Sequence, residues 1–114
     1  TMKRDLRLFI EDILENINLI ENSTKNLSKK EFESDKLIID ATIRRLEIIG
    51  EAVKNIPASF RDKYPKIPWR DIAGFRDVVI HAYFGVVLDR VWEMIERDLP
   101  KLKKQIEKIK IEEK

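Results

Sequence analysis

His81 is the only histidine in the chain, and it is the first candidate for a general acid or base. Its imidazole is the side chain whose ordinary pKa, about 6.5, lies closest to neutral pH. A single histidine near the end of a helix more often has a structural or capping role, so the residue type alone does not decide the function. The chain has no cysteine, which excludes disulfides, thiolate metal ligands and a cysteine nucleophile.

Two further groups of charged residues lie in the predicted second long helix. Arg44 and Arg45 could bind RNA phosphates beside a groove, although a cationic helix face is usually just solvated. Glu47 and Glu51 are spaced i, i+4, as two carboxylate ligands of a metal ion can be. With no second histidine and no cysteine, solvation or pairing with Arg44, Arg45 or Lys54 is the better explanation of these carboxylates. We therefore expect no metal and no other cofactor.

The elements that position these residues are predicted to be helices. Apolar residues recur at steps of three and four near the N-terminus, which predicts a first helix over residues 3–22. Ser28 and Glu31 fit a capping box that starts a short helix, and a second long helix is predicted over 35–55. The residues expected on its buried face are Ile38, Ala41, Arg45, Ile48, Ile49, Ala52 and Ile56.

The second half of the chain predicts two or three more helices. After Pro57 and a turn near residues 59–63, a third helix is expected to begin at Pro68 and to continue to a left-handed cap at Gly85. A fourth helix follows over 88–99, and Pro100 either kinks it or opens a new one. We therefore predict an all-α fold, an antiparallel bundle of four to five helices in a single domain over residues 1–114.

Two tryptophans are more easily explained as anchors of this bundle than as platforms for stacked bases. Trp92 falls in the apolar stripe of its predicted helix, and Trp69 directly follows Pro68. Both are therefore expected in the core or at an interface.

The composition limits the functions that are open to the chain. In 114 residues, 43% are hydrophobic, 39% are charged, and Lys and Arg total 23 against 21 Asp and Glu. A net charge of +2 does not indicate a strongly basic nucleic-acid-binding protein, so any contact with RNA must be local. No apolar run resembles a signal peptide or a membrane span, and a cytoplasmic location without a membrane partner is expected.

The segment from Arg76 to Tyr83 resembles the motif of the HEPN superfamily, in which Arg is followed after four to six residues by His. Its form, Arg-x4-His-x-Tyr, is typical of HepT toxins. Three other segments are similar to that family in the same order: residues 44–52, residues 67–75, and Trp92 with the following 99–102 stretch. The resemblance thus covers nearly the whole chain. Asp77 departs from it, because many members have Asn at that position.

The resemblance implies a metal-independent endoribonuclease toxin. Its expected partners are an RNA substrate, rather than DNA, and a minimal nucleotidyltransferase antitoxin that neutralises the toxin by transferring AMP to the motif tyrosine. Arg76 and His81 would then be the catalytic pair and Tyr83 the modified residue. Two alternatives are a catalytically silent HEPN module, which binds nucleotide or accompanies a nucleotidyltransferase, and a plain dimeric helical scaffold.

Helix geometry makes a homodimer part of this prediction. At 3.6 residues per turn, Arg76 and His81 point about 140° apart, so one straight helix cannot direct both at one phosphate. A second copy related by a two-fold axis can bring Arg76 and His81 together from different chains. Asp77 shares a face with His81 and can fix its tautomer, while Tyr83 shares a face with Arg76. The alternatives are an Asp77–His81 helical ion pair, an Arg76 that serves a carboxylate of the bundle, and a Tyr83 that packs near Phe84.

Overall fold

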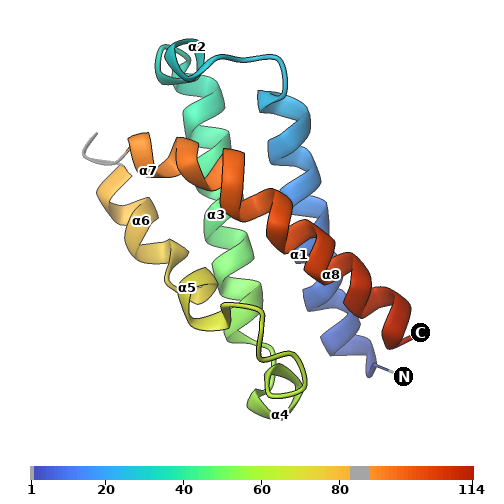
Figure 1. Cartoon of the computed structure of the whole chain (residues 1–114). Helices are drawn as coiled ribbons and strands as arrows, with labels where there is room; N and C mark the ends of the chain where they lie inside the picture. The colour runs from blue at the N-terminus through green and yellow to red at the C-terminus, as the bar shows by residue number, and fades with distance from the viewer. Residues whose placement is uncertain (1, 83–87) are drawn as a thin grey trace.

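The computed structural model describes residues 2–82 and 88–114, apart from the side chains of Arg76, His81 and Ala82. All secondary structure in this part of the chain is helical, which confirms the predicted all-α class (Figure 1). In chain order the elements are α1 (Arg4–Thr24), α2 (Lys29–Glu33), α3 (Lys36–Lys54), α4 (Ala58–Arg61), α5 (Trp69–Ala73), α6 (Phe75–Ala82), α7 (Leu88–Glu93), the π-helical turn η1 (Met94–Asp98) and α8 (Leu99–Glu112).

The long helices pack side by side with alternating directions, as predicted for an antiparallel bundle. Helix α3 lies in the middle, with α1 on one side and α5 and α6 on the other, and α8 packs against α1 (Figure 1). The bundle is elongated, 43 × 25 × 22 Å along its principal axes. None of its described helices is both long and apolar enough to cross a membrane.

Helix α1 follows the apolar periodicity of its sequence closely. It was predicted over residues 3–22 and is observed over 4–24. Its inward stripe is fully buried at four isoleucines, Ile10, Ile13, Ile17 and Ile20. The hydrophobic gain from this stripe, about 1.5 to 3 kcal/mol for each buried side chain, is what fixes α1 against α3 and α8.

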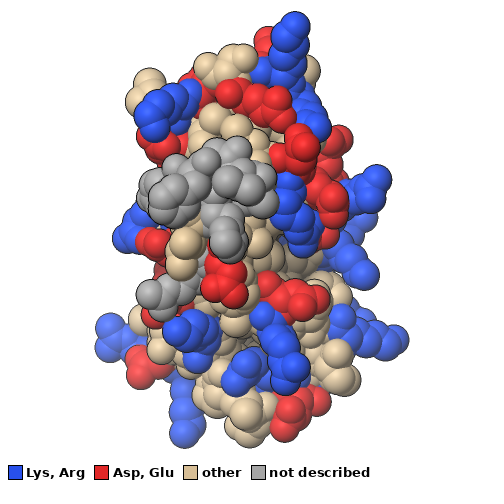
Figure 2. All heavy atoms as spheres, turned by 90° about the vertical axis from the view of Figure 1, so that its left-hand side faces the viewer, with Lys and Arg blue, Asp and Glu red and all other residues tan. Residues whose placement is uncertain are grey.

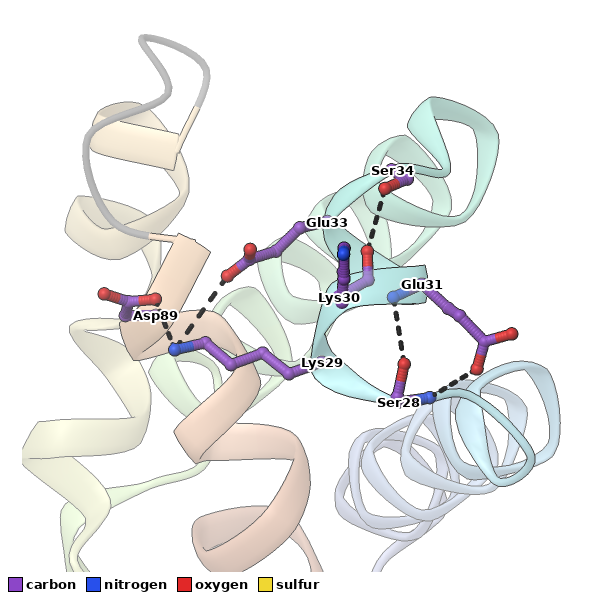
Figure 3. Close-up of polar contacts among 7 residues, drawn as sticks. All are labelled: Ser28, Lys29, Lys30, Glu31, Glu33, Ser34 and Asp89. Carbon is purple, nitrogen blue, oxygen red and sulfur yellow. Dashed lines mark hydrogen bonds and ion pairs between the residues drawn. The ribbon is translucent and has the colours of Figure 1, made fainter.

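The capping box predicted from Ser28 and Glu31 is present at the start of α2 (Figure 3). Ser28 Oγ accepts the Glu31 N–H at 3.1 Å, and Glu31 Oε1 accepts the Ser28 N–H at 2.9 Å. Two of the four backbone donors that every helix start leaves unpaired are therefore satisfied. This explains why a helix of only five residues forms at this point.

Helix α2 holds the beginning of α7, the first element after the motif. Phe32 of α2 is fully buried, and its ring lies 5.3 Å from that of Trp92. Lys29 Nζ lies 2.7 Å from Asp89 Oδ1 (Figure 3). The hydrogen bond raises the pKa of Lys29 and lowers that of Asp89, so both groups stay charged near neutral pH. Because both side chains are largely exposed, the aromatic contact contributes most of the stability of this junction.

Helix α3 begins where the sequence predicts, but its buried face differs from the expected one. Asp35 caps it by accepting the Ile38 N–H at 3.1 Å. Of the residues expected to be buried, Ile38, Ala41, Arg45 and Ile48 are only half-buried. The buried positions of α3 are Thr42, Ile43, Leu46, Ile49, Gly50, Ala52 and Val53. The face is rotated because α3 packs against α5 and α6 as well as against α1, which periodicity along one helix cannot reveal.

The predicted third helix is in fact two helices, α5 and α6, that meet at Gly74. Gly74 caps α5 by donating its N–H to the Arg70 carbonyl at 3.0 Å, and glycine lowers helix propensity by about 1 kcal/mol. Trp69 starts α5 as a buried anchor, because its indole Nε1 donates to the carbonyls of Arg61 and Tyr64. The expected cap at Gly85 lies outside the described residues.

Pro100 lies in the first turn of a new helix, one of the two outcomes predicted for it, and α7, η1 and α8 follow one another without an intervening loop. The five residues before α8 form the π-helical turn η1, in which the Leu99 N–H donates to the Met94 carbonyl five residues earlier. The proline ring would clash with the carbonyl four residues before it in a regular helix. The wider turn relieves that clash and lets α7, η1 and α8 continue one another.

The end of α8 is tied to the segment after α4. Glu113 accepts a hydrogen bond from the Tyr64 hydroxyl at 2.5 Å and from Lys63 Nζ at 2.9 Å. These donors lower the pKa of Glu113, whereas burial and the neighbouring carboxylate raise that of Tyr64. The contact connects residues about 50 positions apart in the chain and fixes the C-terminal turn of α8.

Candidate functional site

The motif predicted to carry the chemistry lies on α6, whose inward and outward faces are clearly divided. Phe75 and Val79 are 4% and 1% exposed and face the core. Asp77 is exposed, and Ile80 is 47% exposed although it is a large apolar residue. Helix α6 therefore presents its outward face to solvent through Asp77 and Ile80.

Arg76 and His81 both belong to α6, at the two margins of this outward face. Counting 100° per residue from position 76, position 80 lies about 40° around the helix, position 77 about 100° and position 81 about 140°. The exposed Ile80 and Asp77 thus lie between the two predicted catalytic positions. Residues 75–82 are helical, and the separation of about 140° between the two side chains stays a prediction from regular helix geometry. Tyr83, the predicted site of modification, lies outside the described residues.

The position of α6 is set by a close approach to α3 at Gly50. A Cβ atom at Gly50 would lie 3.2 Å from the Ile72 carbonyl oxygen, 3.4 Å from that of Ala73 and 3.6 Å from the Phe75 Cβ. A Cβ at residue 50 would push the Ile72 carbonyl away by a few tenths of an ångström, so glycine lets the junction of α5 and α6 rest this closely on α3. Residue 50 is therefore a positioning element for the motif helix.

The two arginines predicted to bind RNA differ in their surroundings. Arg45 Nη1 donates to the Leu19 carbonyl and to Ser23 Oγ of α1, both at 3.3 Å, so its guanidinium ties α3 to α1. Arg44 is exposed and pairs with Glu47. It lines a groove between α1 and α3 that also contains Glu51 and Asp12. The structure thus brings Arg44 together with carboxylates, and it brings neither arginine to the outward face of α6.

The two tryptophans are placed as predicted. Trp69 is 7% exposed and belongs to the core, and Trp92 is half-buried against Phe32.

Two features of the surface escaped the sequence reasoning. The first is the exposure of Ile80, which follows Val78 and Val79 in an apolar run. Neighbouring residues of a helix point in different directions, so a buried Val79 turns position 80 out of the core. This spacing is the sequence signal that could have revealed the exposure of Ile80. The second is the acidic groove between α1 and α3, whose residues on the two helices lie 32 to 46 positions apart in sequence and therefore leave no local signal.

The charge around the motif is mixed. Figure 2 views the molecule from the side on which α5 and α6 lie, and blue and red side chains alternate over the part of this surface that is not grey. This agrees with the small net charge of +2. On the part of this face that Figure 2 does not draw in grey, no extended basic field is visible, so the cations there act on a polyanion one by one and at short range.

Comparison with known proteins assigns the chain to a family. The model of the HepT-like family, described as "Ribonuclease HepT-like", matches residues 13–109. The chain therefore belongs to the HepT-like ribonuclease family of helical proteins, as the motif predicted. Its match to the Thermococcus cleftensis protein named "Probable ribonuclease HepT" has 48% identity over 109 residues, which cover 96% of this chain and 99% of the relative.

A second relative is longer. A Methanocaldococcus jannaschii protein named "Gamma-glutamylcyclotransferase and putative RNase" is 49% identical over 108 residues, or 95% of this chain. The chain spans about half of that relative's length, since the match covers 49% of it. No solved structure shows a significant match.

Proposed function

We propose that this protein is a metal-independent endoribonuclease toxin of a toxin–antitoxin pair, and that it cleaves RNA with Arg76 and His81. The observation that carries the proposal is the conjunction of family and motif. The family model matches residues 13–109, and the Arg-x4-His-x-Tyr motif within that range begins on α6, whose outward face is exposed at Asp77 and Ile80. The T. cleftensis relative, matched over 99% of its length, is itself named a probable ribonuclease.

The two side chains have the chemistry that cleavage of RNA requires. Neutral His81 takes the proton of the ribose 2′-hydroxyl as its oxygen attacks the adjacent phosphorus. The guanidinium of Arg76 binds the phosphate oxygens and stabilises the charge that develops on them. The bond from phosphorus to the 5′-oxygen then breaks, and that oxygen takes a proton from solvent. The products are a 2′,3′-cyclic phosphate and a 5′-hydroxyl, and no metal or cofactor takes part.

A homodimer completes the proposed site. Because Arg76 and His81 lie about 140° apart on α6, both reach one phosphate only if they come from two copies of the helix. A two-fold axis beside α6 would form two such composite sites, each with one Arg76 and one His81. The exposed Ile80 between the two positions supplies an apolar contact for this interface.

Modification of Tyr83 is the proposed means of neutralisation. A minimal nucleotidyltransferase would transfer AMP from ATP: the Tyr83 oxygen attacks the α-phosphorus, pyrophosphate leaves, and the phenolic proton goes to solvent. The sequence predicts that Tyr83, seven residues after Arg76, shares a helix face with it. The added phosphate would therefore compete with RNA for the Arg76 guanidinium, and the nucleoside would block the groove.

Cleavage of RNA by the purified protein in the presence of a chelator tests the nuclease. His81→Ala and Arg76→Ala should each reduce the rate at least about 100-fold, because they remove the base and the cation. Arg70→Ala, which removes an exposed arginine of α5, is the matched control and should cleave at the parental rate. If the two motif variants cut RNA as fast as the parent, the nuclease proposal fails. If the parent itself does not cut, the silent HEPN module is favoured.

Mass spectrometry after incubation with ATP and the nucleotidyltransferase encoded beside this chain tests the modification. An adduct of one AMP is expected on Tyr83, and Tyr64, the only other tyrosine, is the internal control. Tyr83→Phe should cleave RNA and resist neutralisation. An adduct elsewhere, or a Tyr83→Phe protein that is silenced as readily as the parent, would refute the switch.

A further inference from the structure

A groove runs along the pair of helices α1 and α3, separate from the motif helix. Its volume is about 540 Å³, and all its lining residues belong to α1, to α3 or to the residue that caps α3. On α3 and its cap these are positions 44, 47, 48, 51, 52 and 55, and on α1 they are Phe9 and Asp12. No described residue of α5 to α8 lines it.

The spacing of the lining residues gives the groove its shape. Positions on α3 recur every three or four residues from 44 to 55, which corresponds to three helical turns and about 16 Å along the helix axis. A third helix packs naturally into the valley between two neighbouring helices, where its side chains fit between their ridges. The groove therefore has the length and shape to hold a short helix of about three turns.

The floor and the rim of the groove differ in chemistry. Phe9 and Ile48 are half-buried and Ala52 is 6% exposed, so the floor is apolar. The charged lining consists of Asp12, Glu47 and Glu51 against Arg44, a net charge of 1 − 3 = −2. The whole chain has a net charge of +2, so the groove is acidic although the molecule as a whole carries a small positive charge.

This charge decides between the classes of ligand. RNA phosphates would be repelled by the carboxylates, and Arg44 already pairs with Glu47, so the groove is unsuited to the RNA contact predicted for Arg44. Among the described residues, no three acidic or histidine side chains converge closely enough to hold a metal ion. An apolar floor with an acidic rim instead matches a helix that has an apolar stripe flanked by Lys or Arg.

We propose that the α1–α3 groove is a docking site for a cationic amphipathic helix of a partner protein. The apolar stripe of that helix covers Phe9, Ile48 and Ala52, and its flanking cations pair with Glu47 and Glu51. A second copy of this chain does not supply such a helix from α8. The exposed face of α8 is rich in lysine, but Leu99, Leu102, Ile106 and Ile109 are buried in its own core, and the exposed Ile111 alone makes no apolar stripe.

Fluorescence anisotropy with a designed peptide tests the site on the intact protein. The probe is a labelled helix of about 15 residues with leucines at i, i+3, i+4 and i+7 and lysines beside them. Glu47→Gln/Glu51→Gln should weaken binding about 5-fold or more, because it removes two carboxylates of the rim. The matched control is Glu11→Gln/Glu15→Gln, an exposed i, i+4 pair on α1 outside the groove, and should change binding less than about 2-fold.

Two further measurements separate docking from simple charge attraction. A peptide with serines in place of the leucines keeps its charge and should bind at least about 10-fold more weakly if the apolar floor takes part. Backbone amide shifts on binding should be centred on α1 and α3. Equal weakening by both double variants, equal binding of the serine peptide, or shifts centred on α6 would each overturn the proposal. A short RNA that competes for the same residues would overturn it as well.

Discussion

A heterodimer built from two different inactive chains tests the composite site most directly. One chain carries Arg76→Ala and the other His81→Ala, so neither contains the complete motif. If Arg76 and His81 act across the two-fold axis, one of the two sites in this heterodimer combines the intact His81 of the first chain with the intact Arg76 of the second. The other site lacks both groups. The heterodimer should therefore retain about half of the parental activity per dimer, whereas each mutant homodimer keeps about 1% or less.

The experiment needs the two chains with different affinity tags, co-expressed and purified through both tags. The magnitude follows from the geometry of α6, because the 140° between positions 76 and 81 prevents one helix from placing both groups on one phosphate. Cleavage is measured per dimer against the parental protein with the same tags. A heterodimer as inactive as the two homodimers would show that both groups act from one chain, and the reasoning from helix geometry would be wrong.

Three more predictions follow from the described side chains. Ile80→Lys should weaken the homodimer about 30-fold in sedimentation equilibrium, because the exposed half of Ile80 contributes about 1 kcal/mol from each copy, while the stability of the monomer changes by less than about 0.5 kcal/mol. Phe32→Ala should lower the free energy of unfolding by about 3 to 5 kcal/mol in urea titrations, because it empties a fully buried site. The pKa of Glu113 is lower in the folded than in the unfolded protein, so its ionised carboxylate stabilises the fold above about pH 4.5, and protonation removes this stabilisation as the pH falls. Glu113→Gln has no such carboxylate, so its melting temperature should fall less than that of the parent between about pH 5 and 3.

The helices that local chemistry specifies could be predicted from the sequence. Ser28 and Glu31 determine where α2 begins, and Asp35 does the same for α3, because a helix start is decided by side chains within three residues of it. The isoleucines of α1 lie on one side of the helix, which faces α3 and α8 together, so their period alone identifies the buried side. The residues of the motif, and the chemistry that their side chains can perform, could likewise be predicted directly from the sequence.

Features that depend on several neighbours could not be predicted. The buried face of α3 is rotated because two sets of helices pack on it, and the α5–α6 break at Gly74 coincides with the close approach at Gly50. Both are tertiary effects, whereas the sequence pattern reports only one helix at a time. The outward placement of Ile80 follows from helix geometry only once Val79 is known to be buried. The acidic groove combines residues from α1 and α3, so it could be predicted only if the packing of these two helices on each other were already known.

Helix α3 links the two proposed sites and also keeps them apart. Gly50, where the α5–α6 junction rests, and Ile48, on the floor of the groove, are two residues apart and so point about 160° from each other. A helix docked in the groove would lie on the side of α3 that faces away from this junction, and would leave the outward face of α6 open to RNA and to a second copy. Occupation of the groove and access to the outward face of α6 at Asp77 and Ile80 are therefore independent on steric grounds. Any effect of the docked helix on cleavage must pass through α3, and the contact at Gly50 is the point where a shift of α3 would move the motif helix.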